Sequence, residues 1–261
     1  MEPSRIAIRL SCLGLPLRAA LAAAAGLGAR AVQLDARSDI RISELSTSGI
    51  RQLRKLIADH DLRLSSIRFQ TRRGYDSLDG LSRRVDATKQ AMSVAYRLGA
   101  PLVVNQIGMV PEQPEDPAYT ALAEVISDLG RHGARVGAVL AAETGTEPGS
   151  RLAGLLAADE NVFVAAALKP GKLIVNRLSV EEALRALGDR IRIVIANDGV
   201  LDLAAGRGLQ VPLGAGTADY PAILAQLENH SFDGDFVVGD EQARPGSQRA
   251  AGEALQYLSN L

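Results

Sequence analysis

Short apolar runs with the character of β-strands alternate with longer segments of helical periodicity along the chain. In the longer segments apolar residues recur every three or four positions, as at Leu53, Leu56 and Ile57, which is the spacing of one face of an α-helix. The strand-like runs lie at residues 5–10, 31–36, 63–69, 101–108, 138–144, 161–168, 190–197 and 235–238. The pattern predicts eight strand–helix units.

Alternating strands and helices predict a parallel sheet, because each return to the same edge needs a crossover connection. An open doubly wound sheet and a closed barrel both satisfy this rule. Eight units that end in a strand and a helix at 248–258 favour an α/β fold of the closed kind, a single (β/α)8 TIM barrel. No linker or low-complexity tract interrupts the pattern, so one domain is expected over residues 1–261.

Several helix boundaries can be predicted from the same pattern. Ser179 precedes Glu182 at the spacing of a capping box, which predicts a helix start. Gly99 and Gly130 each follow an apolar helical run and predict helix ends. The proline-rich stretch at 111–117 predicts a loop that leads into a helix.

Composition and charge narrow the classes of function. The 29 basic and 30 acidic residues leave a net charge of -1, so no global positive field attracts nucleic acid. No apolar run reaches the ~18 residues that span a bilayer. The alanine-rich segment at 15–27 is interrupted by Arg18 and follows a strand, which favours a helix over an export signal. The single cysteine, Cys12, is expected as a buried thiol, and the lack of disulfides fits the cytoplasm.

Polar side chains follow almost every predicted strand, and the active sites of (β/α)8 enzymes form at these strand ends. They are Ser11, Cys12, Asp35, Arg37, Arg68, Gln70, Arg72, Asn105, Gln106, Glu143, Thr144, Glu147, Lys169, Lys172, Asn176, Asn197, Asp198, Asp240 and Glu241. Such a ring suits a small polar ligand. Taken singly, each residue also fits a structural role as a cap or loop partner. Glu143 favours function, because it follows the apolar run 139–142 and a buried carboxylate needs a cation or several donors.

Three stretches at these strand ends resemble the xylose isomerase-like sugar isomerases and epimerases. They are AAETG at 141–145, LKPGKLI at 168–174 and VPLGAGTADY at 211–220, the last followed by FDGDFVV at 232–238. The resemblance implies a TIM barrel that acts on sugars or sugar phosphates. It also implies one divalent metal ion (manganese, magnesium or cobalt), which polarises vicinal sugar oxygens while carboxylates move a proton.

The metal ligands that the resemblance implies follow strands five to eight, and this chain departs from most of them. Glu143 matches the first glutamate. Lys169 stands where an aspartate is expected, Ile195 where a histidine is expected and Gly239 where the last glutamate is expected. Asp198 belongs to the seventh-strand motif and is kept, and Glu241 lies on the same side of the strand as Gly239. The three histidines, His60, His132 and His230, fall on outer-helix segments rather than strand ends.

These departures predict a site without metal or other cofactor, in which Lys169 replaces the ion as the partner of Glu143. In this first hypothesis the chain is a metal-independent sugar-processing enzyme. Glu143 is the base, Lys169 is an electrostatic stabiliser or a Schiff-base amine, and Asp198 or Glu241 is the second acid–base group. The predicted substrate-binding residues are Arg68, Asn105, Gln106 and Asn197.

Two other functions stay open. One is a non-catalytic barrel that binds a small polar ligand of the carbohydrate class, such as a sugar phosphate, where the turn 214–216 either holds an anion through backbone amides or is a simple turn. The other is a metal-dependent isomerase with Glu143, Asp198 and Glu241 as substitute ligands for manganese, magnesium or cobalt. Neither nucleic acid nor membrane is an expected partner, and a homodimer stays open.

Overall fold

Eight parallel strands form a closed barrel in the order β1-β10-β7-β6-β5-β4-β3-β2, and β2 pairs with β1 to complete the ring. The computed structural model describes residues 1–2, 5–158, 163–202, 207–241 and 243–261. The barrel strands are β1 (Ile6–Arg9), β2 (Ala31–Asp35), β3 (Arg63–Arg68), β4 (Leu102–Asn105), β5 (Val139–Glu143), β6 (Val164–Leu168), β7 (Ile191–Ile195) and β10 (Asp235–Val238). The prediction of a (β/α)8 TIM barrel is confirmed, and the ring closure excludes the open sheet.

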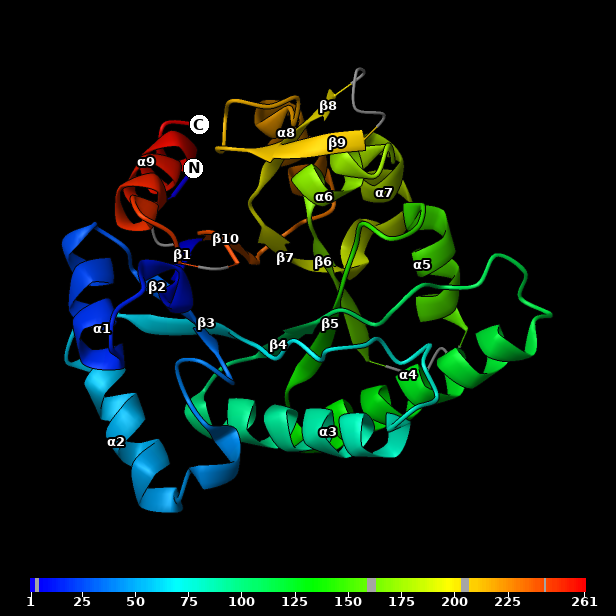
Figure 1. Cartoon of the computed structure of the whole chain (residues 1–261), viewed down its shortest axis with the longest axis horizontal. Helices are drawn as coiled ribbons and strands as arrows, with labels where there is room; N and C mark the ends of the chain where they lie inside the picture. Colours follow the sequence, from blue (N-terminus) through cyan, green and yellow to red (C-terminus); the bar gives the residue numbers. More distant parts are fainter. Residues whose placement is uncertain (3–4, 159–162, 203–206, 242) are drawn as a thin grey trace.

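Helices surround the barrel, and α3 and α4 lie side by side on one flank (Figure 1). The α-helices are α1 (Leu17–Gly26), α2 (Thr47–Ala58), α3 (Leu81–Leu98), α4 (Pro117–Val136), α5 (Gly149–Ala157), α6 (Pro170–Val175), α7 (Val180–Leu187), α8 (Tyr220–Asn229) and α9 (Ser247–Ser259). Short 3-10 turns occur at η2 (Leu10–Leu13), η3 (Ile42–Glu44) and η4 (Gly188–Arg190). Across the described ranges, none of the helices combines the length and the apolar character that a membrane crossing requires.

An antiparallel hairpin, β8 (Asp198–Asp202) and β9 (Arg207–Val211), is inserted between β7 and α8. In Figure 1 it stands beside α6 and α8 at one end of the barrel. Glycines allow its close approach to α6, because a Cβ at Gly208 would lie 2.4 Å from the Cα of Val175. The sequence did not predict this hairpin, since its strands are short and only weakly alternating.

The predicted helix boundaries are confirmed with one exception. The Ser179 side chain accepts a hydrogen bond from the amide of Glu182 and caps α7, and Gly99 ends α3 with a left-handed φ of 86°. The predicted end at Gly130 is wrong, because α4 continues to Val136 and ends at Gly137. Gly130 is buried within this helix. In the predicted sixth strand, residues 161–162 lie outside the described residues.

The inside of the barrel is lined largely by small side chains. The inner cluster consists of Ala7, Ala31, Leu102, Val104, Ala141, Ala165, Ala167, Ile193, Ile195 and Val237. Long polar side chains occupy the space above this layer. Arg9, the last residue of β1, is 1% exposed, and Gln33, within β2, is 0% exposed. A larger apolar cluster fills the layer between strands and helices. The core therefore ends in a buried polar layer at the carboxyl ends of the strands.

Candidate active site at the carboxyl ends of the strands

Lys169 is the central residue of this polar layer. It follows β6 directly, and its backbone amide donates to Thr144 Oγ1, which fixes the chain where α6 begins. The Lys169 side chain is 3% exposed. Its Nζ lies 3.1 Å from Glu143 Oε2 and 2.7 Å from Glu241 Oε1. Two carboxylates therefore share one buried ammonium group.

Glu143 ends β5 with its side chain directed into the barrel mouth, where only 2% of that side chain is exposed. Besides the contact with Lys169, Glu143 Oε1 accepts a 2.7 Å hydrogen bond from Gln70 Nε2. Both carboxylate oxygens are thus bonded in a fixed orientation. Burial alone would raise the pKa of Glu143, but the positive charges of Lys169, Lys172 and Arg9 outweigh burial and lower it.

Glu241 also points into the barrel mouth, although the residue at the expected glutamate position is Gly239. Gly239 has a φ of +112°, and a Cβ there would lie 2.5 Å from Cys12 Sγ. A side chain at this position is therefore excluded both by the backbone and by the buried thiol. Two residues later the chain brings Glu241 to Lys169 and, at 3.6 Å, to Arg68 Nη2.

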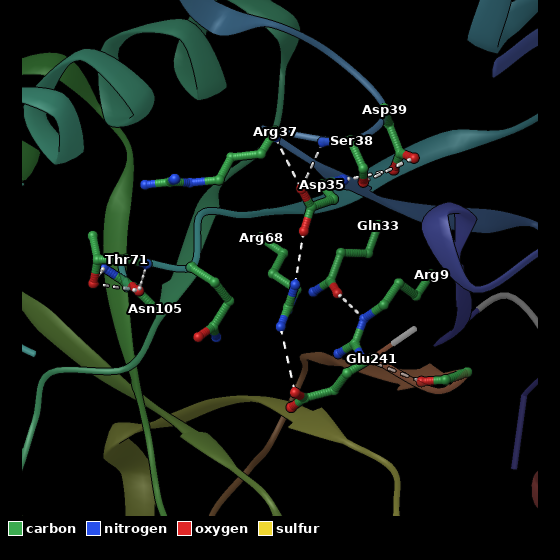
Figure 2. A network of polar contacts seen from close by, with 12 residues as sticks. Arg9, Gln33, Asp35, Arg37, Ser38, Asp39, Arg68, Thr71, Asn105 and Glu241 are labelled. Carbon is green, nitrogen blue, oxygen red and sulfur yellow. Dashed lines mark hydrogen bonds and ion pairs between the residues drawn. The ribbon is translucent and has the colours of Figure 1, made fainter. Parts of the chain in front are cut away.

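The contact between Glu241 and Arg68 joins Lys169 to a second set of buried polar residues, which Figure 2 shows from close by. Arg68 Nη1 donates to Asp35 Oδ2 at 2.7 Å, and Asp35 Oδ1 accepts the backbone amides of residues 37 and 38. Arg9 Nε donates to Gln33 Oε1 at 2.9 Å, and Arg9 Nη1 donates to the Gly239 carbonyl. We call Arg9, Gln33, Asp35, Arg68, Gln70, Glu143, Lys169 and Glu241 the Lys169 cluster.

Sequence analysis missed four members of this cluster as site residues, and Asp35, like Gln70, was named only as a strand-end residue. Arg9 and Gln33 lie inside strands rather than after them, so a search of strand ends passed over them. The signal was present, because Arg9 shares the inward side of β1 with Ala7, two residues before it. Gln70 was among the strand-end residues but was not assigned a role, since nothing in the sequence predicted its contact with Glu143.

Asp198 was predicted as an acid–base group, and the structure places it in a different environment. It is 1% exposed. Its Oδ1 accepts the amides of Gly199 and Ala218 at 2.8 and 3.0 Å, and its Oδ2 accepts those of Gly214 and Gly216 at 3.1 and 2.9 Å. The carboxylate therefore holds the turn after β9, and the anion bound by the glycine-rich turn is the chain's own aspartate. This geometry favours a structural role for Asp198.

The predicted substrate-binding residues also differ in their surroundings. Asn105 bonds the Thr71 amide and the Tyr75 hydroxyl, and Gln106 donates to the Thr71 carbonyl. Asn197 accepts the amide of residue 171 at the start of α6. These three side chains support the loops around the site, whereas Arg68 belongs to the Lys169 cluster itself. Their roles in binding stay predictions.

Lys172 and Glu147 flank the Lys169 cluster. Lys172 is half-buried, and its aliphatic chain packs against Gly145, where a Cβ would lie 2.6 Å from Lys172 Cγ. Burial and the nearby charge of Lys169 lower the pKa of Lys172. Glu147 is buried, and burial raises its pKa. The site thus carries additional charge of both signs around its opening.

A divalent metal does not fit this donor set. Glu143 and Glu241 are held around a cation of the chain, and Asp198 has all its acceptor sites directed at backbone amides. Ile195 belongs to the apolar inner cluster. The three histidines occur at the end of α2, within α4 and after α8, away from the strand ends. No group of three histidine, cysteine or acidic residues in the described part of the chain is arranged to hold a metal.

As the pH falls from about 5 to about 2, the stabilisation from the Lys169–Glu241 pair is expected to disappear. Burial would raise the pKa of Glu241, but the charge and hydrogen bond of Lys169, together with Arg68, lower it to about 2. A carboxylate with a lowered folded-state pKa stabilises the fold above its unfolded pKa and loses this contribution through the folded value. The difference in Tm between the wild type and Glu241→Gln should shrink across this range.

Glu253→Gln provides the matched control for this titration. Glu253 pairs with Arg249 on the exposed face of α9, where the side chain of Glu253 is 60% exposed. Such surface pairs contribute little to stability, so this variant should follow the wild type at every pH. A wild-type advantage over Glu241→Gln that persisted unchanged at pH 2 would contradict the pairing.

Comparison with known proteins gives one matching family and many similar folds. The sequence profile of the family described as xylose isomerase-like TIM barrel matches residues 21–261. No curated protein matches in sequence. Among solved structures, a xylose isomerase domain protein from Planctomyces limnophilus is 21% identical, with 99% of this chain and 95% of that chain covered and a TM-score of 0.83.

Two further structures are similar at lower identity. A xylose isomerase-like TIM barrel protein from Mycobacterium smegmatis, in complex with magnesium, is 18% identical over 98% of this chain and 95% of that chain, with a TM-score of 0.77. D-psicose 3-epimerase from Clostridium cellulolyticum H10, with D-tagatose, is 13% identical over 98% of both chains, with a TM-score of 0.75. At these identities the similarity shows the fold alone.

Proposed function

The chain belongs to the xylose isomerase-like TIM-barrel family, and on that premise we propose that it is a sugar isomerase or epimerase-like enzyme that works without a divalent metal. The observation that carries the proposal is the buried ammonium of Lys169 in contact with both Glu143 and Glu241. A fixed positive charge stands where the family resemblance implies an ion. Similar solved structures include D-psicose 3-epimerase and L-ribulose 3-epimerase, which supports a carbohydrate substrate.

In the proposed reaction Glu143 removes a proton from the carbon next to the substrate carbonyl. The developing negative charge on the carbonyl oxygen is stabilised by the Lys169 ammonium, which is already held in place and needs no reorganisation. Gln70 fixes the orientation of Glu143. Glu143 can then return this proton to the former carbonyl carbon while the proton of the neighbouring hydroxyl group passes to the former carbonyl oxygen. The carbonyl has then moved by one carbon, which is an isomerisation with a single base.

An epimerisation needs a second acid–base group. Of the two predicted candidates for it, Glu241 contacts Lys169. Asp198, the other predicted candidate, bonds four backbone amides instead. The arrangement also favours Lys169 as an electrostatic stabiliser over a Schiff-base amine. Its Nζ is held between two carboxylates at 3.1 and 2.7 Å, whereas a Schiff base requires a nitrogen that is free to attack the substrate carbonyl carbon.

Catalysis is expected to survive removal of metal. Protein treated with a chelator should retain no stoichiometric metal. It should still catalyse the exchange of substrate protons with D2O, measured by NMR on a panel of aldoses and ketoses. Glu143→Gln should abolish the exchange. A stoichiometric ion in the purified wild type, or activity that requires added manganese, would overturn the proposal in favour of a metal isomerase with substitute ligands.

Lys169→Asp provides the matched variant for this experiment. It replaces the ammonium with an oxygen donor next to Glu143 and Glu241, and three oxygen donors suit manganese or magnesium. The variant should therefore gain affinity for Mn²⁺, measured by calorimetry, while the wild type shows none. Equal Mn²⁺ binding by both proteins would show that Lys169 does not exclude the ion.

A non-catalytic ligand-binding role is the second candidate, and one observation favours it. The pKa of Glu143 is lowered by its surroundings, which weakens the carboxylate as a base. A barrel that binds sugars without exchanging any substrate proton in D2O would support this alternative.

A further inference from the structure

The three cations of the Lys169 cluster are not equally neutralised. Arg68 has its own carboxylate in Asp35, and Lys169 has its own in Glu143. Arg9 is hydrogen-bonded to two neutral acceptors, the side-chain oxygen of Gln33 and the carbonyl of Gly239. Glu241 supplies the third negative charge. Without Glu241 the cluster has three cations and two carboxylates.

Two buried guanidinium nitrogens in this cluster also have no acceptor. Among the described residues, Arg9 Nη2 and Arg68 Nε make no hydrogen bond. Arg9 is 1% exposed and Arg68 is 9% exposed. A buried donor that is left unpaired is destabilising, and more so when it is charged. These two guanidinium nitrogens can therefore still donate to an acceptor on a ligand.

Glu241 is the displaceable member of the cluster. Its side chain is 50% exposed, whereas those of Asp35 and Glu143 are 8% and 2% exposed. Asp35 and Glu143 end barrel strands, but Glu241 lies beyond the end of β10, after Gly239. In Figure 2 the Glu241 carboxylate lies below the Arg68 guanidinium, and Arg9 lies close beside the Glu241 side chain. A rotation of this side chain into solvent would uncover both arginines.

We propose that Glu241 is an internal counter-ion, and that a carboxylate of the substrate takes its place against Lys169, Arg68 and Arg9. The inference rests on the proposed function and adds to it the substrate class, a hydroxylated acid that carries an aldehyde or ketone besides its carboxylate. The Glu241 carboxylate indicates which ligand group fits the site, because its Oε1 contacts Lys169 Nζ and its Oε2 contacts Arg68 Nη2. A substrate carboxylate reproduces this pair of contacts and supplies the single negative charge that the cluster lacks without Glu241, whereas a phosphate group carries a charge of about −1.5 to −2.

The displacement of Glu241 also decides between isomerisation and epimerisation. When the substrate displaces Glu241, Glu143 is the carboxylate that remains in contact with Lys169. One base can carry a proton between neighbouring carbons, but inversion at one carbon needs a group on each face. The bound acid is therefore isomerised rather than epimerised.

Equilibrium binding tests the inference independently of turnover. Calorimetry with D-gluconate should show binding to the wild type, and D-fructose and glucose 6-phosphate should bind more weakly. Glu241→Gln should bind D-gluconate about tenfold more tightly if the closed arrangement is roughly 90% populated, because the competing internal anion has lost its charge. Arg68→Gln should weaken D-gluconate binding, and Arg68→Lys, which keeps the charge, should restore part of it.

Glu253→Gln is the control and should bind D-gluconate as the wild type does, because its exposed pair with Arg249 lies on α9. Weaker binding of D-gluconate by Glu241→Gln would overturn the inference, since Glu241 would then contribute to the site. Preference for D-fructose or for glucose 6-phosphate over D-gluconate would also overturn it. Both results would leave the metal-independent chemistry of Glu143 and Lys169 standing, because that is tested by proton exchange and metal content.

Discussion

Replacing Lys169 with methionine is expected to lower the free energy of unfolding at neutral pH by about 3–5 kcal/mol, the usual effect of breaking a buried ion pair from one side. The methionine fills a similar volume, but Glu143 then keeps a buried negative charge without its cation. The Glu143 side chain is only 2% exposed, so water cannot replace the ammonium. Chemical denaturation at pH 7 measures the loss directly.

The stability that Lys169→Met loses should be greater at high pH than at low pH. In Lys169→Met the effect of burial on the pKa of Glu143 is no longer outweighed by the charge of Lys169, so this pKa rises above its ordinary value. The folded variant then binds a proton more readily than the unfolded chain. Its instability is therefore greatest at high pH and is relieved as the pH falls through the raised folded-state pKa. A variant as stable as the wild type at pH 7 would show that the pair carries no buried charge.

The double variant Glu143→Gln with Lys169→Met separates charge from packing. Glutamine keeps the hydrogen bond to Gln70 without the charge, so the pair becomes neutral on both sides. Replacing both members of a buried pair is often close to neutral for stability. The double variant should therefore be more stable than Lys169→Met alone, and the double-mutant cycle gives the coupling energy of the pair. Strict additivity of the two substitutions would contradict the contact.

Asp198→Asn is expected to cost about 3 kcal/mol or more of unfolding free energy, because charge-assisted hydrogen bonds contribute about 1.5–3 kcal/mol each. The aspartate accepts four backbone amides with two oxygens. An asparagine keeps one oxygen and turns an NH2 group towards two of these donors. The turn at 214–218 should loosen, which increased hydrogen exchange at Gly214 and Gly216 would report.

Asp219→Asn is the matched control, because it makes the same substitution in the same loop. Asp219 is exposed and caps α8 by accepting the amide of Ala222. Asparagine caps helices as well as aspartate does, so the control should change stability by less than about 0.5 kcal/mol. If Asp198→Asn behaved like this control, the four-amide arrangement would not stabilise the loop.

Much of the fold and half of the central site could be predicted from the sequence. The alternation of strands and helices is local, and eight units leave few ways to close a parallel sheet. Glu143 and Lys169 end neighbouring strands, so their meeting follows from strand order alone. The inward direction of Glu241 could not be predicted in the same way, because it depends on the positive φ at Gly239 and on the position of Cys12.

The differences between the expected and the observed surroundings of the other residues have a common physical origin. Asp198 follows a strand and carries a carboxylate, so a search by residue type placed it in the chemistry. Its four donors come from residues up to 20 positions away in the chain, in a hairpin and turn that the sequence did not predict. Arg9 was passed over because it lies within a strand. A buried charged side chain is unusual there unless the surrounding inner side chains are small, as the alanines of the inner cluster are.

Gly239 makes a glutamate ligand difficult to introduce at its own position. A glutamate at that position would need a different backbone conformation, and it would also have to displace the Cys12 thiol, whose sulfur lies 2.5 Å from where the first side-chain carbon would stand. No single replacement meets both requirements at once. A single substitution at this position therefore does not provide an ion with a carboxylate ligand. A designed metal site in this barrel would have to use another donor, and Glu241, two residues along the chain, is one that already points into the barrel mouth.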